Sequence, residues 1–224
     1  NLIRIRTERI SLDGVISRLR HNEIDLAPSF QRMGGIWKDV AQSRLIESLL
    51  IRIPLPAFYM DATNEDRWQV IDGLQRLTAL KRFVIDNTLK LRGLEFLKLG
   101  GQSYDDLDRN LQRRINETQV TLYLVEQGTP DKVKFNIFKR INTGGVPLSG
   151  QEIRHALYQG PATDFLRVLA ASDEFKSATN NSVSPMRMAD RECVLRFLSF
   201  AMVPYQEYGR SEDLDSFLID RMTS

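Results

Sequence analysis

Two strand-like runs that lead through a glycine turn into a helix constrain the fold of this chain most strongly. Residues 57–60 and 68–71 are rich in aromatic and β-branched side chains, and the turn-like stretch 61–66 separates them. The second run passes through residues 72–76 into residues 77–84, where apolar side chains recur at helical spacing. A strand that feeds directly into a helix indicates a sheet with helices packed beside it.

The rest of the chain extends this prediction. Ser11 suits the N-cap of a first helix, and Ser149 with Glu152 forms a capping box. We expect an α+β fold, a mixed sheet with helices followed by an all-helical C-terminal part, divided into a domain over 1–160 and a helical extension over 161–224. Because the chain begins at Asn1, we take it for a fragment of a longer protein. The other expected strands are 22–26, 119–125 and short strands within 88–104, and the expected helices are 12–20, 39 to the prolines at 54 and 56, 106–117, 130–141, 149–160, 163–171, 186–203 and 212–222.

The ionisable residues exclude several classes of protein. The 31 Lys and Arg nearly balance the 29 Asp and Glu, leaving a net charge of +2, so contact with nucleic acid requires a local basic patch. The one cysteine, Cys193, cannot form an internal disulfide, which fits a cytoplasmic location, and we expect it to be buried. No apolar run reaches membrane-spanning length. With only His21 and His155 present, neither a His/Cys zinc site nor a His-Asn-His nuclease is expected, and His155 suits a surface or packing role.

The turn Asp72-Gly73-Leu74-Gln75-Arg76 has the composition of an anion site. The N-terminus of a helix presents unpaired backbone N–H groups and a dipole that favours negative charge. Gly73 lets a ligand approach the backbone, Arg76 can bind a phosphate bidentately, and Asp72 can orient Arg76 or hold a divalent ion. A purely structural alternative has Asp72 capping the helix and Arg76 in solvent.

Two further segments carry candidate ligand-binding residues. Gln31 and Arg32 form a polar pair beside an aromatic residue, and Trp37 can stack on a base, although core packing also explains it. The segment 140–145 ends a helix with a polar, glycine-rich loop that can donate several hydrogen bonds. A glycine C-cap without any ligand explains that segment equally well.

The order of these motifs resembles the N-terminal domains of GmrSD-type, modification-dependent restriction systems. The resemblance covers roughly residues 3–200, and the family's hallmark, usually Asp-Gly-Gln-Gln-Arg, appears here as residues 72–76. Leu74 replaces the first glutamine and removes one hydrogen-bonding side chain from the turn, which bears on catalysis more than on binding. The other matching segments are residues 30–37, 45–56, 138–153 and 187–192.

This resemblance implies a ParB/sulfiredoxin-like fold that binds, and hydrolyses, a nucleoside triphosphate with Mg²⁺. It also implies a DNA-associated regulatory domain that senses modified phage DNA and controls a separate nuclease domain or subunit. Asp72, Gln75 and Arg76 are then the catalytic residues, and Asp72 also contributes to holding Mg²⁺. The residues expected to bind the nucleotide are Gln31, Arg32, Gly73, Thr78, Arg140, Asn142, Thr143 and Gly144, with Trp37 stacking on the base.

Two other functions stay open. In a non-catalytic reader of modified DNA, Trp37 would stack on a flipped base while Gln31 and Gln75 read its edges, and Leu74 favours this alternative. A ParB-like nuclease is less well supported, because Asp72 has no compact group of carboxylates beside it. No Walker-type sequence is present, so a P-loop enzyme is not expected.

The remaining charged clusters have plain structural explanations. The aspartates within 105–108 fit a solvated helix start better than a metal site. Arg109, Arg113 and Arg114 suit a solvated helix face and a contact to a DNA backbone equally well. The C-terminal helices fit an effector interface, the interface of a homo-oligomer or a cover for the core.

Overall fold

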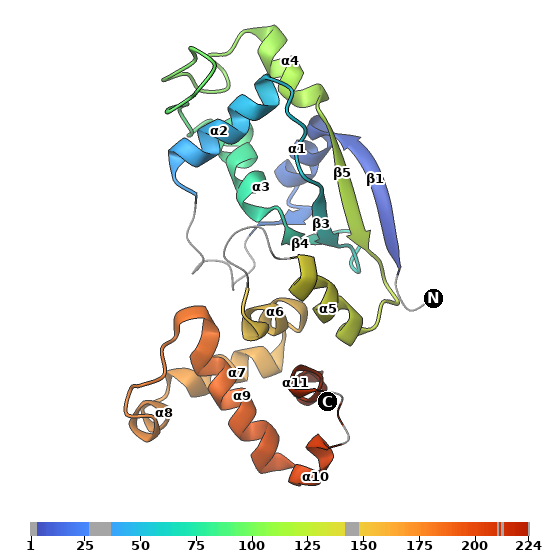
Figure 1. Cartoon of the computed structure of the whole chain (residues 1–224), viewed down its shortest axis with the longest axis vertical. Helices are drawn as coiled ribbons and strands as arrows, with labels where there is room; N and C mark the ends of the chain where they lie inside the picture. The colour runs from blue at the N-terminus through green and yellow to red at the C-terminus, as the bar shows by residue number, and fades with distance from the viewer. Residues whose placement is uncertain (1–3, 27–36, 142–147, 210, 212, 224) are drawn as a thin grey trace. The chain divides into compact units, whose positions relative to one another are not determined.

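The structure, a computed structural model, describes residues 4–26, 37–141, 148–209, 211 and 213–223. These residues fall into two compact units, the first formed by 4–26 with 37–129 and the second by 130–223 (Figure 1). None of the helices described is both long and apolar enough to cross a membrane.

The first unit contains a five-stranded mixed sheet in the order β1-β5-β3-β4-β2. Neighbouring strands β1 and β5 are antiparallel, as are β3 and β4, whereas β3 with β5 and β2 with β4 are parallel. This mixture confirms the expected α+β class with a mixed sheet. The strands are β1 (Ile5–Ser11), β2 (Ile24–Asp25), β3 (Phe58–Asp61), β4 (Trp68–Asp72) and β5 (Gln119–Val125).

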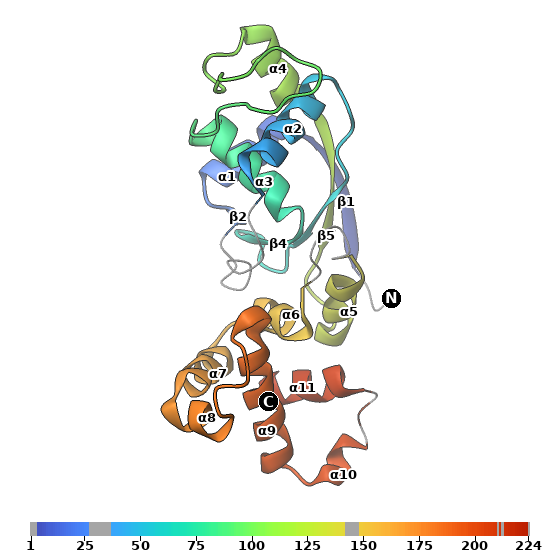
Figure 2. The same ribbon diagram turned by 60° about the vertical axis from the view of Figure 1, so that its left-hand side comes forward.

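Three helices of the first unit, α1 (Leu12–Arg20), α2 (Asp39–Leu50) and α3 (Leu74–Leu80), lie on the same side of strands β5 and β1 (Figures 1 and 2). A π-helical turn, η2 (Lys81–Ile85), continues α3, and α4 (Arg109–Glu117) precedes β5. One hydrophobic core joins these helices to the sheet. Its fully buried members include Leu12, Ile16, Ile46, Phe58, Phe83 and Leu122.

All the regular secondary structure in the described residues of the second unit is helical, which confirms the expected all-helical C-terminal part. Ser149 and Glu152 form the expected capping box: Ser149 Oγ accepts from the Glu152 N–H at 3.1 Å, and Glu152 Oε2 accepts from the Ser149 N–H at 2.6 Å. The elements are α5 (Asp131–Ile141), α6 (Gly150–Leu157), α7 (Pro161–Ala171), α8 (Asp173–Ala178), η3 (Met186–Met188), α9 (Ala189–Met202), α10 (Tyr205–Tyr208) and α11 (Leu214–Thr223).

A buried arginine ties four helices of this unit together. Arg154 on α6 is fully buried, and its guanidinium donates to Asp215 on α11 at 2.7 Å and lies 3.2 Å from Glu192 on α9. Lys139 on α5 binds the second oxygen of Asp215 at 2.8 Å. Helices α5 and α6, which join this network, belong to the second compact unit, which begins at residue 130.

The stretch 88–104 differs from expectation, because no strand occurs there in the structure. A buried carboxylate organises part of it instead. Glu47 on α2 accepts hydrogen bonds from the backbone N–H groups of Glu95, Phe96 and Leu97 at 2.9, 2.8 and 2.8 Å. Residues 95–97 therefore turn around the carboxylate of Glu47.

Candidate functional site

The glycine turn lies between β4 and α3, next to the beginning of β3. Asp72 pairs with Tyr59 across the sheet, and Gly73 follows with φ +103° as the N-cap of α3. A Cβ at position 73 would overlap Cδ1 of Phe58 and lie 3.0 Å from its Cε1. Glycine is therefore required here both by backbone conformation and by the close approach of the Phe58 ring.

Arg76 in the first turn of α3 is buried rather than in solvent. Its guanidinium donates to the carbonyl oxygen of Pro56, to that of Ala57 at 3.1 Å and to Asp72 Oδ2 at 2.9 Å. The guanidinium also lies over the Phe58 ring, with Cζ 4.5 Å from the ring centroid. These three bonds engage three of its five N–H groups, so Arg76 anchors the chain before β3 to the turn.

The charge of Arg76 is set by two opposing effects. Burial lowers the pKa of Arg76, while the neighbouring Asp72 carboxylate counteracts that shift. An arginine stays protonated through shifts of this kind, because its ordinary pKa lies far above neutrality. The turn therefore presents a fixed, partly desolvated positive charge beside the N-terminus of α3.

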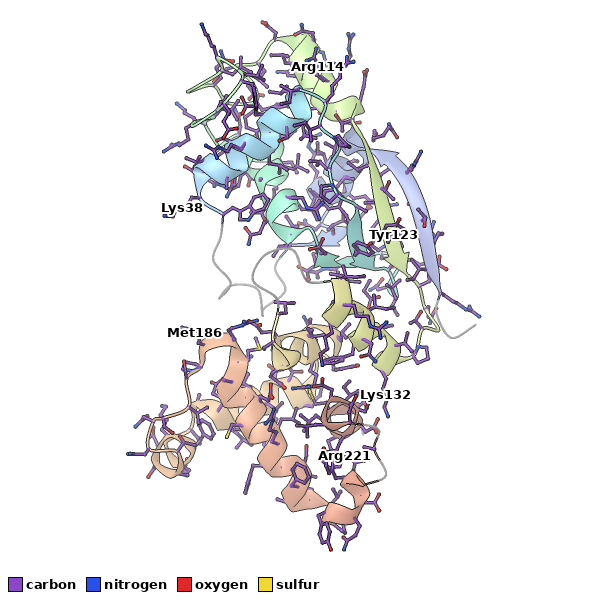
Figure 3. The ribbon with its side chains drawn as sticks, viewed as in Figure 1. Lys38, Arg114, Tyr123, Lys132, Met186 and Arg221 are labelled. Atoms are coloured by element: carbon purple, nitrogen blue, oxygen red, sulfur yellow. The ribbon has the colours of Figure 1, made fainter. Side chains whose placement is uncertain are left out.

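Gln75 and Trp37 are brought together by a hydrogen bond across 38 residues of sequence. The backbone N–H of Trp37 donates to Gln75 Oε1 at 3.0 Å, and the carbonyl oxygen of Trp37 accepts from Gln42 Nε2 at 2.7 Å. Arg82 in turn donates to Gln42 Oε1 at 2.8 Å. Lys38, labelled in Figure 3, follows Trp37 at the start of α2. With its backbone held on both sides, Trp37 is nevertheless 37% exposed, so it is not an ordinary core residue.

Leu74 and Thr78 lie one helical turn apart on α3 and are both half-buried. Leu74 packs against the main hydrophobic core. The residue that departs from the Asp-Gly-Gln-Gln-Arg pattern thus contributes apolar contact area in place of a hydrogen-bonding group.

The other expected nucleotide-binding residues are not part of this turn as described. Arg140 is exposed in the last turn of α5, in the second unit. The remaining expected residues, Gln31, Arg32, Asn142, Thr143 and Gly144, lie outside the described residues.

The acidic residues before α4 serve the local fold. Asp106 accepts from both the N–H and the Oγ of Ser103, at 2.8 and 2.7 Å, and these bonds lower its pKa. Helix α4 begins at Arg109, after the N-cap Asp108, instead of at Asp106 as expected. Within the described residues, no group of three or more His, Cys, Asp or Glu side chains is arranged to hold a metal ion.

His155 and Cys193 both belong to the helical unit. His155 is buried, which agrees with the expected packing role, and its Nδ1 lies 3.4 Å from Arg191 Nη1. Burial, reinforced by the positive charge of Arg191, lowers the pKa of His155 to about 4. Cys193 is only half-buried, so the expectation of a buried small hydrophobe is wrong for it.

Sequence reasoning missed the residues that support the turn. Phe58 contributes an aromatic ring, Pro56 and Ala57 contribute carbonyl oxygens, and Gln42 contributes an amide to the Trp37 backbone. The prolines before β3 can be read from the sequence. Nothing in the neighbouring residues indicates that carbonyl oxygens of this segment accept hydrogen bonds from an arginine.

Comparison with known proteins gives one match. A family model described as "GmrSD restriction endonuclease, N-terminal domain" matches residues 15–159, which is more than half of the chain and includes the whole glycine turn. No curated protein matches the chain. No solved structure matches it either.

Proposed function

This chain belongs to the family of GmrSD restriction endonuclease N-terminal domains, and we propose that it is a cytoplasmic, nucleotide-binding regulatory domain whose nuclease partner acts on modified phage DNA. Family membership supplies the restriction context. The glycine turn supplies the proposed ligand site.

The observation that carries this proposal is the hydrogen bond between Gln75 and Trp37. It ties the backbone of Trp37, whose side chain is partly exposed, to the turn that contains Gly73 and the partly desolvated guanidinium of Arg76. Phosphates favour a positively charged turn at a helix start, and a nucleobase favours an aromatic surface. A nucleoside triphosphate satisfies both demands at once.

Each residue of the turn has a distinct role in this proposal. Gly73 holds the turn in the left-handed conformation that starts α3, and the two N–H groups of Arg76 not engaged by Pro56, Ala57 and Asp72 neutralise the phosphate charge. The side-chain amide of Gln75 keeps its Nε2 donors available, because Trp37 uses only the carbonyl oxygen. The nucleotide-binding roles of Gln31, Arg32, Thr78, Arg140, Asn142, Thr143 and Gly144 rest on the resemblance alone.

A single carboxylate fits the way Mg²⁺ is usually held beside a triphosphate. Mg²⁺ keeps most of its waters and takes one or two carboxylates together with phosphate oxygens, and Asp72 offers Oδ1 while Oδ2 binds Arg76. When bound, the ion would supply neutralisation of phosphate charge. Asp72, Gln75 and Arg76 are the proposed hydrolytic residues, acting by positioning and charge stabilisation.

A second function, a non-catalytic reader of modified DNA, is favoured by one observation. Leu74 places an apolar side chain against the core where the family pattern has a polar one. The turn then has fewer groups for hydrolysis, while the exposed Trp37 still offers a surface to a flipped base.

Calorimetric titration with ATP, GTP, CTP and UTP in the presence of Mg²⁺ tests the proposal. Trp37→Ala is the informative variant, because its indole is exposed, whereas any change at Arg76 also removes bonds to Pro56 and Ala57. Loss of one stacking partner weakens binding by about 1–3 kcal/mol, or roughly 5- to 150-fold. Phe96→Ala removes an aromatic ring that is 71% exposed on the same unit and serves as the matched control.

The outcomes separate the two functions. Binding of one nucleotide that weakens in Trp37→Ala and not in Phe96→Ala supports the nucleotide site, and a phosphate-release assay then measures hydrolysis. If the folded chain binds none of the four nucleotides, the proposal is wrong. Trp37-dependent binding of a modified single strand would in that case establish the reader function.

A further inference from the structure

A second positively charged site lies at the C-terminal end of α2, away from the glycine turn in sequence. A surface cleft of about 430 Å³ is formed between α4, the segment that follows α2 and the first residue of β5. Arg114, labelled on α4 in Figure 3, is one of the residues that line the cleft. Its charged and amide-bearing lining residues are Arg52, Asn110, Arg113, Arg114, Glu117 and Gln119.

The cleft is positively charged because three arginines face one glutamate in its lining, a net charge of +2. Asn110, Arg113, Arg114 and Glu117 follow one another at spacings of three, one and three residues, so a single face of α4 supplies them. The net charge of the whole chain is also +2, so the residues outside the cleft lining carry no net charge in total.

The arginines of the cleft keep most of their hydrogen-bonding capacity. Arg114 Nη1 donates to the carbonyl oxygen of Leu50 at 2.8 Å, which orients the guanidinium with one of its five N–H groups. Arg113 lies 3.8 Å from Glu117, and both side chains are well exposed, at 64% and 71%. An exposed pair at that distance is weak and is readily exchanged for a phosphate.

Arg52 occupies a backbone position that normally selects glycine. It has φ +65°, its N–H donates to Leu49 O at 3.0 Å, and the N–H of Ile53 donates to Ser48 O at 2.8 Å. This pair of bonds is the Schellman motif, in which the left-handed residue is usually glycine. A non-glycine residue costs free energy in this conformation, and here it adds the Arg52 side chain to the lining of the cleft.

We propose that this cleft binds a backbone phosphate of double-stranded DNA, a role that rests on the DNA-associated function proposed above. Arginine pairs with phosphate bidentately, and the open, aromatic-free lining suits contact with the sugar-phosphate backbone instead of a base. The contact positions the domain on DNA and is independent of sequence. It leaves recognition of the modification to another part of the protein.

Fluorescence anisotropy of a labelled duplex, measured over a series of salt concentrations with the 224-residue chain, tests this assignment. Arg113→Gln and Arg52→Gly are each expected to weaken binding about three- to tenfold and to reduce the slope against log salt by about one. Arg52→Gly also relieves the left-handed strain, so weaker binding cannot be attributed to unfolding. Arg109→Gln, an exposed arginine on α4 outside the cleft lining, is the matched control.

Calorimetric titration of the same variants with inorganic phosphate and with the nucleotide distinguishes the sources of phosphate. Duplex binding that weakens in the two cleft variants, but not in Arg109→Gln, supports the assignment. Unchanged duplex binding in both cleft variants overturns it, as does a wild-type chain that binds inorganic phosphate in the cleft but no duplex. The cleft variants are expected to keep the nucleotide binding that depends on Trp37. A failure of the nucleotide proposal and a failure of the cleft proposal therefore appear in different titrations.

Discussion

The ring of Phe58 lies so close to Gly73 that any side chain at position 73 would overlap it. Gly73 has φ +103°, and the guanidinium of Arg76 lies over the same Phe58 ring. The turn is thus held by an aromatic ring from the neighbouring strand as well as by its own sequence.

Gly73→Ala is expected to destabilise the first unit by about 3 kcal/mol, because it combines a left-handed backbone with an overlap in the core. Gly101→Ala is the control: its φ is +86°, but a Cβ there meets nothing within 4 Å, so about 1 kcal/mol is expected. Urea unfolding followed by tryptophan fluorescence measures both, since Trp37 and Trp68 lie in this unit. Equal losses in the two variants would show that Phe58 does not constrain the turn.

Glu47→Gln is expected to cost about 2 kcal/mol, because a neutral amide offers one acceptor to the backbone donors that the carboxylate now binds. Burial opposes ionisation, but those backbone N–H groups and Arg44 outweigh it and lower the pKa of Glu47. Its stabilising effect is therefore present above the ordinary value of 4.5 and is lost as the pH falls below it. Glu95→Gln, which breaks only an exposed pair with Arg44, should change the free energy of unfolding by less than about 1 kcal/mol.

Arg154→Met is expected to destabilise the helical unit by about 1.5–3 kcal/mol, because it removes the charged hydrogen bonds of a buried guanidinium while Lys139 and Arg196 still pair with the two carboxylates. Arg196→Met is the matched control, since Arg196 pairs with the same Glu192 at the surface and should contribute less than about 1 kcal/mol. Far-ultraviolet circular dichroism during urea unfolding measures the loss of helix. A shift no larger than that of the control would contradict the role assigned to Arg154.

His155 makes the stability of the helical unit depend on pH. Its pKa is about 4 in the folded chain against an ordinary 6.5, so the unfolded chain binds the extra proton between those values. Stability is complete above pH 6.5 and falls by up to about 2 kcal/mol as the pH approaches 4, after allowance for solvent screening. Unfolding experiments across this range should show a flatter profile for His155→Gln than for His21→Gln, and identical profiles would contradict the assignment.

Elements with a local signal were predicted well from the sequence. Helix α1 begins at Leu12 because Ser11 Oγ accepts from the Gly14 N–H at 3.3 Å, and β5 coincides with its alternating apolar pattern. Strand β1, in contrast, was not predicted. Its sequence, Ile-Arg-Thr-Glu-Arg-Ile-Ser, is highly charged, and its strand conformation depends on pairing with β5, more than 100 residues away.

The candidate site shows the same limit. The residue types of the turn were readable in the sequence, including the glycine and the arginine. The partners of Arg76 and Gln75 were not, because Pro56, Ala57 and Trp37 reach them through the tertiary fold. The structural alternative in which Arg76 lies in solvent is wrong for that reason, since the sheet brings two carbonyl oxygens to its guanidinium.

Residues 53–57, between α2 and β3, touch both proposed sites. Pro54 lines the arginine cleft, while the carbonyl oxygens of Pro56 and Ala57 are bound by Arg76. Proline fixes its own φ at about −65°, so this segment has little freedom to change length. If a bound nucleotide drew the guanidinium of Arg76 toward its phosphates, it would weaken the anchoring of one end of the segment while the other end still borders the cleft. Any change in duplex affinity caused by the nucleotide would then be matched by an equal change in nucleotide affinity caused by the duplex.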